Sequence, residues 1–125
     1  MLLADANQYL PTEELTLSLR ETLDNLRFSG IDCVLQAGGT RQYPAGMLVT
    51  AYDLAEAAAE AVRGRGSVFC ASVAPDADTV LLLETDAILS PEALRPALQN
   101  SGLTLSVTEA DGTCRLRIGG VQPNA

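Results

Sequence analysis

The most regular pattern of hydrophobic and polar positions lies in residues 44–65, where it predicts the longest helix of the chain. One stripe is apolar, recurs at three- and four-residue steps, and consists of Met47, Ala51, Leu54, Ala55, Ala58 and Val62. A second stripe is polar and consists of Asp53, Glu56, Glu60 and Arg63. We expect the apolar stripe to lie on a core, whereas the polar stripe is either a solvated helix face or the wall of a site.

Two interpretations are open for the segment before this helix. Leucine alternates with polar residues over 15–19, which favours a short edge strand. An S-x-x-E capping box at Ser18 and Glu21 then predicts a helix over residues 19–29. The competing interpretation is a single helix over residues 12–29.

The remaining pattern predicts a sheet with short connections. Apolar or alternating runs predict strands at residues 31–37, 67–73, 79–84, 103–107 and 113–118. Asp111-Gly112 is a hairpin signal, and residues 90–100 form a short helix that Pro96 should weaken or kink. This order predicts a two-layer α/β sandwich, with a mixed sheet of about five to six strands and two to three helices on one face.

Length and composition support a single domain. The chain has 125 residues, of which 47% are hydrophobic, enough for a core of ordinary size. We interpret residues 1–11 as the tail of a preceding helix or a linker, 12–120 as the domain, and 121–125 as a disordered tail. The abrupt apolar start favours one domain of a longer protein.

Charge and missing residue types narrow the function classes. A net charge of −8 argues against nucleic acid or an anionic membrane as partner, because both need a basic footprint. The chain has no His and no Lys, which excludes histidine-based hydrolases, Schiff-base chemistry and a P-loop. Scattered cysteines at Cys33, Cys70 and Cys114 indicate buried thiols in a reducing compartment, and we expect a cytoplasmic location without membrane contact.

Three stretches of the chain resemble the ATP-binding catalytic domain of sensor histidine kinases, which has the GHKL or Bergerat fold. The family's entry helix and second strand are similar to SLRETLDNLRFSGIDCVLQAGG, and its central helix is similar to YPAGMLVTAYDLAEAAAEAV. Its terminal hairpin is similar to SGLTLSVTEADGTCRLRIGG. The resemblance covers most of residues 18–120 and implies the same α/β fold.

The resemblance also implies a metal and nucleotide site on the central helix. In the family this helix carries an Asn that holds Mg²⁺ on the ATP phosphates, with an acidic residue about one turn before it. Glu56 matches the acidic position, which implies a catalytic and metal-binding role. Glu60 falls at the Asn position, and a shift of a few residues places Ala57 there instead, so the Asn is absent in either alignment. A Glu60 carboxylate could still bind Mg²⁺ through oxygen.

The family's adenine-binding motif is an Asp followed by glycines. Asp86 matches the Asp, but apolar residues replace the glycines, and the chain leaves no room for a lid before Ser90. The resemblance thus implies that Asp53, Glu60 and Asp86 bind the cofactor. The alternatives are a solvated face for the helix carboxylates and a plain loop residue for Asp86.

Two functional hypotheses follow. The first is the ATP-binding domain of a sensor histidine kinase in two-component signal transduction, with degraded nucleotide motifs. It would be a histidine-kinase-type phosphotransferase or a pseudo-kinase, with ATP and Mg²⁺ as cofactors. Its partners would be other domains of a longer sensor protein, or a homodimer through them. The second is a non-catalytic interaction or signal-transmitting module on the same scaffold, with a filled or absent pocket and no cofactor. A free-standing hydrolase is a distant third.

Overall fold

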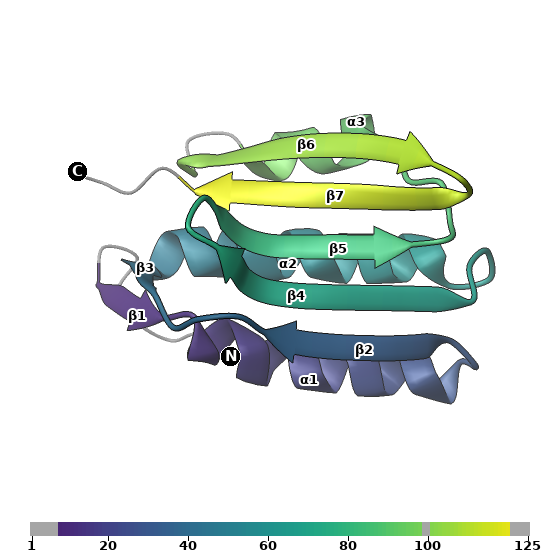
Figure 1. Ribbon diagram of the computed structural model, residues 1–125, viewed down its shortest axis with the longest axis horizontal. Helices are drawn as coiled ribbons and strands as arrows, with labels where there is room; N and C mark the ends of the chain where they lie inside the picture. Colours follow the sequence, from purple (N-terminus) through teal and green to yellow (C-terminus); the bar gives the residue numbers. More distant parts are fainter. Residues whose placement is uncertain (1–7, 99–100, 121–125) are drawn as a thin grey trace.

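The computed structural model describes residues 8–98 and 101–120 (Figure 1). The predictions for the first seven residues and for a tail at 121–125 lie outside the described residues. In the described part of the chain, no helix is long and apolar enough to cross a membrane.

One mixed sheet of five strands forms the front layer of the molecule in Figure 1. Its strand order is β2-β4-β5-β7-β6, where only the pair β2 and β4 is parallel. The strands are β2 (Asp32–Ala37), β4 (Val68–Asp76), β5 (Thr79–Thr85), β6 (Leu103–Ala110) and β7 (Thr113–Gly120). This sheet confirms the predicted fold class.

The described helices lie together on the other side of this sheet, behind it in Figure 1. They are α1 (Glu13–Phe28), α2 (Ala45–Val62), α3 (Pro91–Leu94) and the 3-10 helix η1 (Arg95–Leu98). Because successive strand residues point to opposite faces, every second residue of β4 is buried beneath the helices. The opposite face carries charged side chains, including ion pairs from Arg115 to Glu84 (2.8 Å) and from Arg117 to Asp76 (3.0 Å).

The segment before α1 differs from the prediction. Tyr9–Pro11 was expected to belong to a helix tail or linker, but it forms strand β1, which pairs antiparallel with β3 (Gln42–Pro44). This pairing is favoured because Leu10 lies opposite the buried Tyr43. The two-stranded ribbon of β1 and β3 also provides hydrogen-bond partners for backbone groups next to α1 and α2. This ribbon joins the start of α1 to the start of α2.

Helix α1 is a single helix, so the competing interpretation of this segment was right. The edge strand at residues 15–19 and the capping box at Ser18 were wrong. Leu15 and Leu19 are fully buried one helical turn apart, whereas Leu17 is 58% exposed. The alternation of leucines was therefore a helical pattern that also carried one exposed leucine. The helix begins at the carbonyl of Thr12, which accepts from the backbone N–H groups of Leu15 and Thr16.

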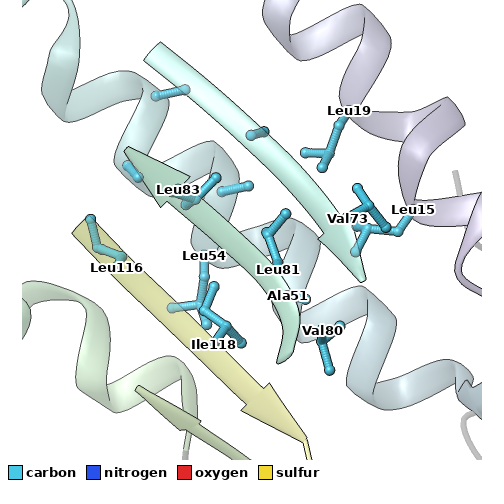
Figure 2. Packing of buried hydrophobic residues seen from close by; sticks show 14 of the residues in the cluster. Leu15, Leu19, Ala51, Leu54, Val73, Val80, Leu81, Leu83, Leu116 and Ile118 are labelled. Carbon is cyan, nitrogen blue, oxygen red and sulfur yellow. The ribbon is translucent and has the colours of Figure 1, made fainter. Parts of the chain in front are cut away.

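Helix α2 confirms the apolar stripe, because all six predicted positions are buried. Leu54 and Ala51 of α2 lie against side chains of β5 and β7 in the core (Figure 2). The small side chains of its alanines allow this helix to pack close to the sheet. Its opposite side is left free to line surface cavities.

Two local predictions in the second half of the chain are confirmed. The hairpin of β6 and β7 turns at Asp111 and Gly112, whose φ angles of 51° and 78° suit the tight turn that an Asp-Gly pair favours. The short helix after Ser90 is interrupted as expected, since α3 gives way to the tighter η1 that contains Pro96.

Candidate functional site

A cavity of about 370 Å³ lies between the C-terminal half of α2 and the segment that contains α3. Its lining consists of Ala57, Ala58, Glu60, Ala61, Arg63, Arg65, Leu89, Ser90 and Leu94. Three of these residues are buried and make an apolar floor, namely Ala58, Leu89 and Leu94. The charged residues are exposed and stand at the mouth. An apolar floor with a few polar groups is the usual composition of a small-molecule site.

The end of α2 places two arginines at this mouth. The helix stops at Val62, whose carbonyl accepts from the backbone N–H groups of Arg65 (3.0 Å) and Gly66 (2.9 Å). Gly64 has a φ of 77°, in the left-handed region that favours glycine, so the chain can reverse there. Arg63 and Arg65 flank this glycine and both line the cavity.

The mouth is locally positive although the chain is acidic overall. Arg63 Nε lies 3.5 Å from Glu60 Oε2, and the Glu60 side chain remains 77% exposed. An ion pair this exposed contributes little, because solvent screens it. With two arginines and one glutamate, the cavity mouth favours an anion, in contrast to the net charge of −8.

Asp86 does not line this cavity; it closes the turn that follows the arginines. Its carboxylate accepts hydrogen bonds from the hydroxyl of Ser67 and from the backbone N–H groups of Ser67 (2.8 Å) and Val68 (3.1 Å). Gly66 leaves room for it, since a Cβ there would lie 2.8 Å from Asp86 Oδ1. These hydrogen bonds, that of the Ser67 side chain first, lower the pKa of Asp86 from 3.8 to about 2.

We expect Asp86→Asn to lower the melting temperature at neutral pH, because the amide loses the charge that strengthens these hydrogen bonds. The folded-state pKa lies below the unfolded value, so the stabilisation is present above about pH 3.8 and is lost as the pH falls through about 2. Thermal unfolding by circular dichroism should therefore show a deficit at neutral pH that shrinks towards pH 2. Asp53→Asn, at an exposed position of α2, is the control. A deficit that stays constant with pH would contradict this role for Asp86.

Glu56 faces α1 and not the cavity. Its Oε1 accepts from the hydroxyl of Tyr52 (2.8 Å), and its Oε2 accepts from Oγ1 of Thr22 (3.1 Å), a nearly buried residue of α1. Glu56 thus lines a separate polar groove between the two helices, together with Glu21 and Asn25. It connects α1 to α2 through hydrogen bonds.

The predicted site residues are therefore not brought together. Glu60 lines the cavity, Glu56 points to α1, Asp86 bonds to the start of β4, and Asp53 is exposed on α2. Within residues 8–98 and 101–120, no three His, Cys, Asp or Glu side chains are placed to hold a metal ion. Mg²⁺ is usually held by one or two carboxylates, and Glu60, the carboxylate that lines the cavity, stands beside two arginines whose positive charge repels a cation. This lining does not fit the Mg²⁺ site that the resemblance implies.

Arg63 lies on the predicted polar stripe of α2, but Arg63, Arg65, Leu89 and Leu94 were not among the predicted site residues. The arginine–glycine–arginine order at the end of α2 was the available signal, because it predicts a reversal that carries both side chains to one place. The two leucines carried no such signal, since any short amphipathic segment contains them.

The cysteines lie apart from the cavity lining and are free thiols. Cys114 is buried, whereas Cys33 and Cys70 are half-buried. Burial raises the pKa of Cys33 and of Cys70 above the ordinary value, which favours the protonated thiol.

Comparison with known proteins places this architecture in one structural class. No family model and no curated protein sequence matches the chain. Among solved structures, it is similar to the cytoplasmic segment of the histidine kinase QseC, with 14% identity and a TM-score of 0.65 over 92% of this chain and 78% of that chain. The histidine kinase domain of a blue-light activated kinase from Erythrobacter litoralis is 16% identical, with a TM-score of 0.65 over 93% of this chain and 64% of that chain.

The mycobacterial sensor histidine kinase MprB is also similar, with 14% identity and a TM-score of 0.60 over 93% of this chain and 99% of that chain. At such identities the likeness establishes the fold alone. The chain therefore has the α/β sandwich fold found in the catalytic domains of sensor histidine kinases. The expected fold is confirmed.

Proposed function

We propose that this chain is an ATP-binding domain of the histidine kinase type, with degraded nucleotide motifs, that serves in two-component signal transduction in the cytoplasm. The observation that supports this proposal is the cavity against α2, in a chain with the fold of histidine kinase catalytic domains. In the resemblance drawn from sequence, the central helix is also the element that carries the nucleotide.

The chemistry of the cavity suits a nucleotide. A purine ring is flat and apolar on its faces, which matches a floor of Ala58, Leu89 and Leu94. Phosphate groups are polyanionic and match arginine, whose planar guanidinium binds phosphate oxygens in pairs. We therefore propose that the base enters towards the leucines and that the phosphates stay at the mouth.

A phosphoryl acceptor must lie in another segment or protein, because the chain contains no histidine. We propose that the partners are other domains of a longer sensor protein or a homodimer through them. Transfer of a γ-phosphoryl group depends mainly on positioning and charge stabilisation. Because the carboxylates of α2 do not converge on one site, we expect the domain to bind nucleotide but to have lost phosphotransfer, as in a pseudo-kinase.

Isothermal titration of the folded domain with ATP tests the proposal. We expect saturable binding with a dissociation constant below about 1 mM. Circular dichroism before and after the titration establishes that the protein is folded. If the folded domain gives no binding heat at millimolar ATP, the proposed ATP-binding function is wrong.

A non-catalytic interaction module on the same scaffold is the second candidate. The observation that favours it is Ile88, which is 56% exposed in the short connection between β5 and α3, where the family has its lid. Two of the predicted ligand residues, Glu56 and Asp86, are also occupied by internal hydrogen bonds. In this case ATP gives no heat, and Ile88→Ser weakens binding to the partner domain without a change in stability.

A further inference from the structure

We infer that the cavity holds the phosphate groups of its nucleotide with Arg63 and Arg65 and does so without Mg²⁺. This inference rests on the proposed binding of a nucleotide at the same cavity. It concerns the charge that neutralises the phosphates, which in this chain comes from guanidinium groups at the end of α2.

The carboxylates of α2 do not converge on the cavity. A Mg²⁺ ion that bridges ATP to a protein is usually held by one or two carboxylates together with the phosphates. Glu56 faces α1 and accepts two hydrogen bonds there, at 2.8 Å and 3.1 Å. Glu60 remains at the cavity, but Arg63 Nε lies 3.5 Å from it and Arg65 also lines the mouth, so positive charge repels a cation there. A phosphate that approaches the mouth therefore meets arginine beside a single carboxylate.

The turn that carries the two arginines is held in place by hydrogen bonds on both sides. Two backbone hydrogen bonds to the carbonyl of Val62 close it on one side, and the Asp86 carboxylate fixes Ser67 and Val68 on the other. Arg63 and Arg65 are consequently presented by a fixed backbone, although both side chains are exposed. A preorganised backbone lowers the entropy cost of binding.

The ion pair between Arg63 and Glu60 is easily exchanged for a phosphate. Arg63 and Glu60 are 3.5 Å apart with 43% and 77% of their side chains exposed. Such a pair contributes little, whereas a phosphate offers more charge and paired oxygen acceptors. We expect phosphate to displace Glu60 from Arg63.

If arginines hold the phosphates, Mg²⁺ should not raise the affinity of the protein for ATP. In a metal-dependent site, EDTA abolishes ATP binding. In an arginine site, Mg²⁺ reduces the negative charge of ATP and weakens its attraction to the guanidinium groups. We expect wild-type protein to bind ATP in excess EDTA as tightly as in excess Mg²⁺, or up to about fivefold more tightly.

Variants assign the effect to named residues. Arg63→Ala and Arg65→Ala should each weaken ATP binding by about tenfold in EDTA, since a hydrogen bond to a charged group contributes on that order. The affinity for adenosine, which carries no phosphate, should stay unchanged in both variants. Circular dichroism shows that they fold, and Arg63→Lys should retain part of the affinity.

Glu60→Gln gives opposite signs for the two possibilities. If Glu60 competes for Arg63, the variant binds ATP more tightly, by roughly threefold. If Glu60 is a metal ligand, the variant loses affinity in Mg²⁺. Glu56→Gln is the matched control, one helical turn away, and should leave the ATP affinity unchanged because residue 56 faces α1.

The possible outcomes distinguish the inference about the arginines from the proposed ATP-binding function. Binding in EDTA that depends on Arg63 and Arg65 supports the inference. Binding that requires Mg²⁺, with a loss in Glu60→Gln, overturns the inference and leaves the proposed ATP-binding function standing. No binding of ATP to folded protein in either condition overturns the proposed function and the inference with it.

Discussion

Leu54→Ala is expected to lower the free energy of unfolding by about 2–5 kcal/mol, the usual range for a buried leucine. Leu54 is 1% exposed and lies on the face of α2 that packs against the sheet (Figure 2). The smaller side chain leaves a void between the helix layer and the sheet, and the surrounding structure relaxes only partially into it. This loss is a large part of the stability of an ordinary domain.

Chemical denaturation followed by circular dichroism measures this loss. The matched control is Asp53→Ala, one residue away on the same helix, where the exposed side chain is replaced by the best helix former. We expect the control to change stability by less than about 0.5 kcal/mol. An equal loss of unfolding free energy in the two variants would contradict the packing of Leu54 in the core.

The second large effect is expected from filling the cavity. Ala61 is half-buried and lines the cavity, so Ala61→Phe places a ring in the space proposed for the nucleotide. We expect the affinity for ATP to fall by at least about tenfold, with little change in melting temperature, because the ring enters a cavity that is already open.

Isothermal titration and thermal unfolding of the same preparation provide the measurement. Ala110→Phe is the control, since residue 110 is exposed at the end of β6 and does not line the cavity. Its ATP affinity should equal that of the wild type. If Ala61→Phe binds ATP normally, the nucleotide does not occupy this cavity.

Much of the fold could be predicted because burial imposes a period on the sequence. The six apolar positions of α2 are buried as expected, and the Asp111-Gly112 turn forms the expected hairpin. The start of α1 was ambiguous for a physical reason. Leucines at positions 15 and 19 satisfy a helical period, while Leu17 adds an alternation that has no structural consequence, since its side chain is exposed.

The candidate site was harder to predict, because spacing along α2 does not say which groove a side chain enters. Residues four apart differ by about 40° around a helix axis. That difference is enough to direct Glu56 to the groove beside α1 and Glu60 to the cavity beside α3. The two grooves exist only because other elements pack on either side of α2.

The role of Asp86 also depends on tertiary structure. Phe69 lies opposite Thr85 in the pairing of β4 with β5, so the residue after Thr85 reaches the start of β4. Register therefore directs this carboxylate to the backbone of Ser67 and Val68. The motif alone could not predict that the Asp86 carboxylate bonds to the protein's own backbone and not to a ligand.

The central claim is that ATP occupies the cavity between α2 and α3, and amide chemical shifts measured during an ATP titration test it most directly. The largest shifts should fall in residues 57–65 and 89–94, whereas Thr22 and Asn25, in the groove beside Glu56, should change little. Saturable shifts centred on the groove beside Glu56, or no shifts at all from folded protein, would contradict the claim.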